Sequence, residues 1–81
     1  MTQPPNHIID ALGLKCPLPV LRAAKALRAM DAGAELTVLA DDPVAVIDIP
    51  HFCYEAGHEL LSQSDAEGVQ TYVIRRGENQ T

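Results

Sequence analysis

One stretch organises this chain: Gly13-Leu14-Lys15-Cys16-Pro17-Leu18-Pro19, a cysteine between two prolines, directly ahead of a helical pattern that runs from Val20 to Met30. Proline is tolerated in the first turn of a helix, where its missing N–H would have no partner inside the helix. We therefore predict that a helix begins here, at Pro17 or at Pro19. Either choice leaves the Cys16 sulfur within about one turn of the helix start.

This position favours the charged form of the cysteine. A helix N-terminus offers unpaired amides and a partial positive charge, and the neighbouring Lys15 adds a full one. Thiols in such places have pKa values of roughly 3.5–7.5, against about 8.5 for a free thiol. We predict that Cys16 is largely ionised at neutral pH and that Pro17 and Pro19 present it on a rigid shoulder. The alternative is a small apolar cysteine with prolines that only punctuate the helix.

Length and composition allow one modest domain. The chain has 81 residues, of which 47% are hydrophobic, and its net charge is −5. An acidic balance argues against general affinity for nucleic acid or anionic membranes. No apolar run approaches membrane-spanning length and the N-terminus has no signal pattern, so we expect a cytoplasmic protein. Two cysteines in that compartment indicate reactive or buried thiols rather than a structural disulfide.

Local patterns predict the order of the elements. We expect residues 1–6 to be a disordered lead, residues 7–77 a single domain and residues 78–81 a flexible tail. The first predicted elements are a strand over His7–Leu12, the helix after Cys16 and a strand over Glu35–Ala40. A second helical region opens at Asp41-Asp42-Pro43, with Pro43 at its first position, breaks at Pro50 and closes at Gly57. Two strands follow, His58–Ser64 and Val69–Arg76, joined by a turn at 65–68. Two helices can cover one face of a four-stranded sheet, which predicts a two-layer α/β sandwich with βαβαββ order.

The first helix is amphipathic. Val20, Ala24 and Leu27 share one face of the helical wheel. The opposite arc is basic although the protein is acidic, and the small residues Ala26 and Ala29 lie between its charges. We interpret this arc as a docking surface for acidic partners; the alternative is an ordinary solvated face. The residues that we assign to partner docking are Arg22, Lys25, Arg28 and Asp42.

Polar residues around the cysteine receive supporting roles. Asp10 is a hydrogen-bond acceptor at the end of the first strand or a charge that tunes the loop, and Gly13 allows a positive φ there. Asp42 is expected to cap the second helix, beside Asp41. Cys53 is a packed core thiol or, alternatively, a resolving thiol for Cys16.

Metal and cofactor chemistry find no support in the sequence. The two cysteines and the three histidines form no Cys-x-x-Cys or His-x-x-x-His pair, so we expect no metal. There is no glycine-rich phosphate loop, and the serines crowd a turn where no Ser-His-Asp arrangement can be argued. We therefore expect no cofactor.

At this point the residues indicate a family. Asp10-Ala11-Leu12-Gly13-Leu14-Lys15-Cys16-Pro17-Leu18-Pro19, followed by Asp41-Asp42-Pro43, Asp48-Ile49-Pro50 and Phe52-Cys53, closely resembles the TusA sulfur-carrier family, also called SirA-like. The resemblance runs from about Ile8 to Gly77. Cys-Pro-x-Pro alone is a short signal, and the downstream motifs in register make it specific.

The resemblance implies both a fold and a function. It implies a mixed four-stranded sheet with two helices on one face, similar to the C-terminal domain of bacterial translation initiation factor three. It implies that Cys16 accepts sulfane sulfur from a cysteine desulfurase or a rhodanese and carries it as a persulfide to an acceptor protein, without the turnover site of an enzyme. Such a relay feeds tRNA 2-thiouridine formation, molybdenum-cofactor synthesis or sulfur oxidation.

Two other classes of function remain open. A dithiol redox protein would use Cys16 and Cys53 and form an intramolecular disulfide. A regulatory or RNA-binding module would follow from the fold relationship alone, and the acidic charge counts against direct contact with nucleic acid. We expect a monomer, because a carrier must expose one face to successive partners.

Overall fold

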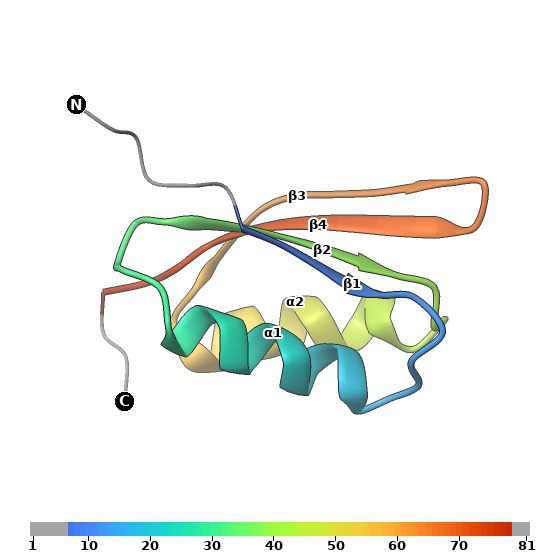
Figure 1. Cartoon of the computed structure of the whole chain (residues 1–81), viewed down its shortest axis with the longest axis horizontal. Coiled ribbons are helices and arrows are strands. Elements are labelled where there is room, and N and C mark those ends of the chain that lie inside the picture. The colour runs from blue at the N-terminus through green and yellow to red at the C-terminus, as the bar shows by residue number, and fades with distance from the viewer. Residues whose placement is uncertain (1–6, 79–81) are drawn as a thin grey trace.

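The computed structural model describes residues 7–78 (Figure 1). Its elements are β1 (His7–Ala11), α1 (Leu18–Arg28), β2 (Glu35–Ala40), α2 (Ala45–Ala56), β3 (Glu59–Ala66) and β4 (Val69–Arg75). This order confirms the predicted βαβαββ arrangement. The predicted lead at residues 1–6, and residues 79–81 of the predicted tail, lie outside the described residues.

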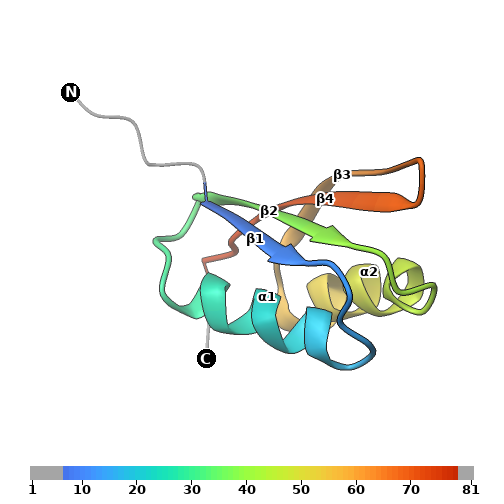
Figure 2. The same cartoon turned by 45° about the vertical axis from the view of Figure 1, so that its right-hand side comes forward.

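The strands form one mixed sheet in the order β1-β2-β4-β3. β1 and β2 are parallel, whereas β4 is antiparallel to both of its neighbours, β2 and β3. Both helices cover the same face of the sheet (Figures 1 and 2), which confirms the predicted two-layer sandwich. Because β1 and β2 are parallel, the loops that follow them emerge at the same edge of the sheet, and both helices begin there.

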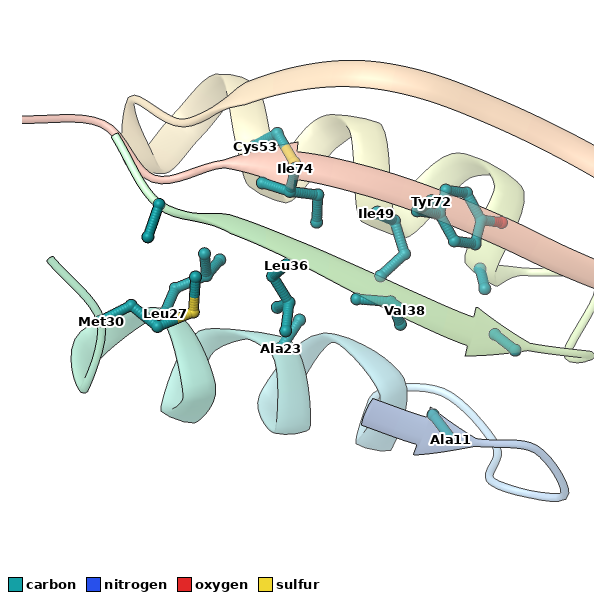
Figure 3. Packing of buried hydrophobic residues seen from close by; sticks show 13 residues of the cluster. Ala11, Ala23, Leu27, Met30, Leu36, Val38, Ile49, Cys53, Tyr72 and Ile74 are labelled. Carbon is teal, nitrogen blue, oxygen red and sulfur yellow. The ribbon is translucent and has the colours of Figure 1, made fainter. Parts of the chain in front are cut away.

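The core lies between the helices and the sheet (Figure 3). Alternate residues of β2 and β4 face the helices, as expected for strands with one covered face. Each helix buries one line of side chains, and that of α1 runs through Ala23 rather than the predicted Ala24, which is half-buried beside it. The largest fully buried side chains are Tyr72, Leu27, Leu36, Ile49, Ile74, Val38 and Pro19.

Helix α1 begins between the two predicted starts, Pro17 and Pro19. Leu18 is its first residue and Pro19 its second, and Pro17 occupies the position just before it. Proline at the second helical position is compatible with the helix for the same reason as at the first, since neither N–H would have a partner inside the helix. The helix ends at Arg28, two residues before the predicted Met30.

Helix α2 is continuous through Pro50, so the predicted break is wrong. Proline inside a helix costs about 3 kcal/mol. Ile49 and Cys53 are buried on either side of it, at 0% and 2% exposure. Burial of such side chains contributes about 1.5–3 kcal/mol each, which offsets the lost hydrogen bond and holds one helix against the sheet. The end at Gly57, in the left-handed conformation, is as predicted.

The hairpin between β3 and β4 has a shorter turn and longer strands than predicted. Glu67 and Gly68 form its turn with φ values of 55° and 83°, so the strands extend into the predicted loop at 65–68. Positive φ at both central residues suits the right-handed twist of the strands. A bulge interrupts the pairing of β3 between Leu60 and Ser62. The hairpin projects beyond the helices (Figure 1), and β3 is exposed there.

The opposite end of the molecule is closed by the last residues of the domain. The Arg76 Nε group donates to the Leu27 carbonyl at 2.7 Å, which ties the chain after β4 to the end of α1. The Gly77 amide donates to His58 Nδ1 at 3.0 Å. A β-carbon at Gly77 would overlap the Gly57 carbonyl, so only glycine fits this approach.

Candidate functional site

The chemistry proposed for Cys16 would take place at the edge of the sheet where both helices begin. Cys16 lies in the loop between β1 and α1, and the loop between β2 and α2 lies beside it (Figure 2). Cys16 is exposed, and its peptide bond to Pro17 is cis. Parallel neighbouring strands bring the two loops together, because their carboxyl ends meet at one edge of the sheet.

The loop that carries Cys16 is held by backbone hydrogen bonds to the two aspartates of the second loop. The Cys16 amide donates to Asp42 Oδ2 at 2.6 Å, and the Gly13 amide donates to Asp41 Oδ1 at 3.0 Å. Gly13 has the predicted positive φ, +81°. These contacts fix the backbone on both sides of Lys15, so the position of the sulfur is set by residues about 26 positions later in the sequence.

Asp10 has the first of the two roles that the sequence allowed. Its Oδ1 atom accepts the Leu12 amide at 2.9 Å, two residues later. This local contact turns the chain at the end of β1. Asp10 therefore shapes the start of the cysteine loop as a strand-end acceptor.

Asp42 connects the cysteine loop to the core. It is 6% exposed, and its backbone carbonyl accepts a hydrogen bond from Gln70 Nε2 at 3.0 Å. Tyr72, which is fully buried, donates its hydroxyl to Gln70 Oε1 at 2.5 Å. The chain of contacts thus runs from the middle of β4 to the Cys16 amide.

The two roles predicted for Asp42 need correction. Its carboxylate faces inward, with Oδ1 accepting the Val44 amide at 3.3 Å, so it is not available as a docking group on the surface. The residue before α2 is Val44, and no side chain caps the helix. Pro43 consequently lies before the helix instead of opening it. Asp42 supports the cysteine loop from below.

The thiol of Cys16 has a partner that the sequence did not predict. Its Sγ atom donates a hydrogen bond to Asp48 Oδ2 at 2.9 Å. This hydrogen bond, and the negative charges of Asp48 and Asp42, raise the pKa of Cys16 above its ordinary value. A neighbouring anion opposes ionisation of a thiol, because the thiolate would be a second negative charge at hydrogen-bond distance. The predicted lowering of the pKa is therefore wrong, and the resting group is the neutral thiol.

The groups expected to stabilise a thiolate are engaged elsewhere or absent. The Leu18 amide donates to the Lys15 carbonyl at 2.7 Å, and Pro19 has no N–H to offer. The Lys15 side chain is exposed and forms no ion pair within the described part of the chain. The partial charge of a helix end is about half an elementary charge, whereas Asp48 brings a full one in contact with the sulfur. The carboxylate therefore prevails.

The second cysteine lies in a different environment. Cys53 is 2% exposed and packs beside Ile74 under the sheet (Figure 3). Burial raises the pKa of its thiol to about 11. Both cysteines are free. These features support a packed core thiol, because a reactive cysteine needs an accessible and readily ionised sulfur.

The basic arc of α1 is exposed as expected. Arg22, Lys25 and Arg28 are all on the surface, and none of them is in an ion pair within residues 7–78. Of the two small residues between them, Ala29 is exposed, whereas Ala26 packs against the core. The arc runs along α1 from the end that carries Cys16. Its docking role stays a prediction.

Asp48 was missed because it is 32 residues from Cys16 and belongs to a helix expected to break. In a continuous α2 it lies in the first turn, half-buried, on the same edge as the cysteine loop. The signal was available in the topology. Two parallel strand–helix units place the first turns of their helices side by side, so an acidic residue in the first turn of α2 could have been tested against Cys16.

Fold and site together define a small two-layer domain that presents one exposed thiol at the edge of a mixed sheet. The family described as Sulfurtransferase TusA matches residues 7–76 of the chain. Among solved structures, the chain is similar to the crystal structure of a SirA-like protein from Desulfitobacterium hafniense, with 36% sequence identity and a TM-score of 0.78; the match covers 88% of this chain and 97% of that one. The protein belongs to the TusA family of sulfurtransferases and sulfur carriers. No helix within residues 7–78 is long and apolar enough to cross a membrane.

Proposed function

We propose that this protein carries sulfane sulfur as a persulfide on Cys16 and passes it to a thiol of an acceptor protein. The observation that carries the proposal is the exposed Cys16 thiol on a loop whose backbone is fixed by Asp41 and Asp42. A carrier must let two different proteins reach one sulfur atom in turn. An exposed thiol at the edge of a small domain permits this, whereas a deep pocket would hinder it.

The chemistry follows the logic of thiol–disulfide exchange. The Cys16 sulfur attacks the outer sulfur of a persulfide on the donor, and the donor thiol leaves. An acceptor thiol later attacks the outer sulfur of the Cys16 persulfide in the same way. The protein is regenerated at the end of each delivery and acts as a carrier between two enzymes.

The partners that we propose are those that the resemblance to the family implies. We propose a cysteine desulfurase or a rhodanese as donor and a thiol-bearing relay protein as acceptor, in tRNA 2-thiouridine formation or a related sulfur-trafficking pathway. The exposed arc of Arg22, Lys25 and Arg28 suits an acidic surface on such a partner. Charge pairs of this kind mainly raise the rate of association, so the loading rate should fall as salt is added.

Intact-protein mass spectrometry tests the proposal directly. The wild type, Cys16→Ser and Cys53→Ser are incubated with a cysteine desulfurase and cysteine, and in parallel with a rhodanese and thiosulfate. We expect a gain of one sulfur atom, reversed by reductant, in the wild type and in Cys53→Ser but not in Cys16→Ser. If no protein gains sulfur from either donor, the carrier function is wrong. Loss of two hydrogen atoms on mild oxidation of the wild type would then favour the dithiol redox alternative.

A further inference from the structure

Asp48 contacts the reactive sulfur itself. Its Oδ2 atom accepts a hydrogen bond from the Cys16 thiol, with 2.9 Å between Oδ2 and Sγ. The ion pairs of residues 7–78 are His51 with Glu55 and Arg75 with Glu59, so no cation of the described chain neutralises Asp48. The carboxylate lies in the first turn of α2, where the helix end favours its negative charge. An unneutralised carboxylate in contact with a thiol is placed to receive its proton.

We propose that Asp48 is a catalytic residue of sulfur transfer, which accepts the proton of Cys16 as the sulfur attacks and gives a proton to the thiolate that leaves. This inference rests on the proposed carrier function. It assigns the proton transfer that a neutral resting thiol requires, since the thiolate is the attacking species in exchange at sulfur.

The step balances without an oxidant or a reductant. The donor is a hydropersulfide, R–S–S–H. As the Cys16 proton moves to Asp48, the Cys16 sulfur forms a bond to the outer sulfur, and the S–S bond of the donor breaks with its electron pair on the inner sulfur. The leaving thiolate takes the proton from Asp48, which gives R–SH and Cys16–S–S–H. Delivery to an acceptor runs in the same way, with the acceptor proton passing through Asp48 to the departing Cys16 sulfur.

The other charged groups around Cys16 are committed to different contacts. Asp42 accepts the amides of Cys16 and Val44, one on each oxygen, and lies 6% exposed beneath the loop. The Asp41 and Asp10 carboxylates each accept an amide of the loop, and Lys15 has no lone pair in its charged form. By position, Asp48 is therefore the group that receives the proton. Among residues 7–78, the charges that act on the Cys16 thiol are those of Asp48 and Asp42, and Lys15, Asp10 and Asp41 belong to the same two loops and the strand end before them.

Two rates measured on the same proteins separate proton transfer from a simple effect on the thiol pKa. The first is alkylation of Cys16 by iodoacetamide, which follows the thiolate. The second is single-turnover loading by glutathione hydropersulfide, a small donor that needs no docking surface. Both are followed by intact mass against pH for the wild type, Asp48→Asn and Asp48→Glu. The matched control is Asp31→Asn, which removes the same charge from an exposed residue after α1.

We expect the two rates to move in opposite directions in Asp48→Asn. Alkylation becomes faster at neutral pH, because the anion that opposes ionisation of Cys16 is gone. Loading becomes slower by about 100-fold, a usual size for the loss of a general base. Asp48→Glu should recover part of the loading rate, and Asp31→Asn should leave both rates unchanged. If Asp48→Asn loads as fast as the wild type or faster, Asp48 only raises the pKa and the proposal is overturned.

The carrier function and the role of Asp48 fail in different ways. If the wild type takes sulfur neither from the hydropersulfide nor from a desulfurase that carries a persulfide, both proposals are overturned. If the wild type loads and Asp48→Asn loads equally fast, only the role of Asp48 is overturned. Circular dichroism confirms that each variant is folded. If Asp48→Asn does not fold, the wild type still decides: loading should slow in deuterium oxide more than alkylation does, and equal slowing overturns the proposal.

Discussion

Replacing Asp42 by Asn removes the charge beneath the cysteine loop with little change in volume. The carboxylate is 6% exposed and accepts the Cys16 amide at 2.6 Å and the Val44 amide at 3.3 Å. Asn can keep its oxygen toward only one of these donors, and the shorter bond to Cys16 is the stronger one. Hydrogen bonds to charged groups contribute about 1.5–3 kcal/mol, so losing the charge and one acceptor should cost about 2 kcal/mol of unfolding free energy.

The assay is urea and thermal unfolding, combined with hydrogen exchange of the Cys16 amide. A loss of about 2 kcal/mol lowers the melting temperature by roughly 8–16 °C in a domain of this size. The matched control is Asp41→Asn, whose bond to the Gly13 amide, at 3.0 Å, is exposed. Because water can take the place of the Asp41 carboxylate at this exposed amide, Asp41→Asn should lower the free energy of unfolding by only about 0.5 kcal/mol. Equal losses in the two variants, or unchanged exchange at Cys16, would refute the view that the buried carboxylate holds the loop.

Three further predictions concern the rest of the fold. Burial lowers the pKa of His58 below 6.5, so the native state binds a proton at His58 less readily than the unfolded state does. The free energy of unfolding, measured in urea, should therefore fall as the pH drops below about 6.5. In His58→Gln, the plot of unfolding free energy against pH should be flatter in that range. Gly77→Ala should lose about 1–3 kcal/mol in the same assay, because the new methyl group overlaps the Gly57 carbonyl; an unchanged midpoint would show that the contact is loose. Pro50→Ala should gain about 1 kcal/mol by restoring a hydrogen bond inside α2, and a loss by circular dichroism melting would mean that the proline is required there.

The sequence predicted the architecture because its signals were local. The pattern of glycines and prolines placed the element boundaries to within a few residues, and Glu35–Ala40 was predicted with the bounds that β2 has. The break at Pro50 failed for a tertiary reason. A proline rule describes an isolated helix, and the buried side chains of Ile49 and Cys53 outweigh it once the helix packs on the sheet.

The site was predicted in part. Asp10 and Gly13 have the local geometry that the sequence predicted: Asp10 accepts the amide of Leu12 two residues later, and Gly13 has a positive φ. Cys16 is exposed just before α1, but the aspartates that hold its loop come from the distant β2–α2 loop. The protonation state of the Cys16 thiol could not be predicted from its neighbours in the sequence. It depends on Asp48, which approaches only after two strand–helix units have packed side by side, and the local rule for helix starts gave the opposite sign.

The burial of Cys53 determines how long a loaded carrier would keep its sulfur. A second accessible thiol beside a persulfide attacks its inner sulfur, expels hydrogen sulfide and leaves a disulfide, which discharges the carrier before a partner is met. Cys53 is sealed in the core with a pKa of about 11, so this internal discharge requires the domain to open. The free energy needed to open the domain would therefore limit how fast a Cys16 persulfide is lost by this route. Variants that loosen the core should release sulfide faster, in proportion to the fraction of molecules in which the core is open.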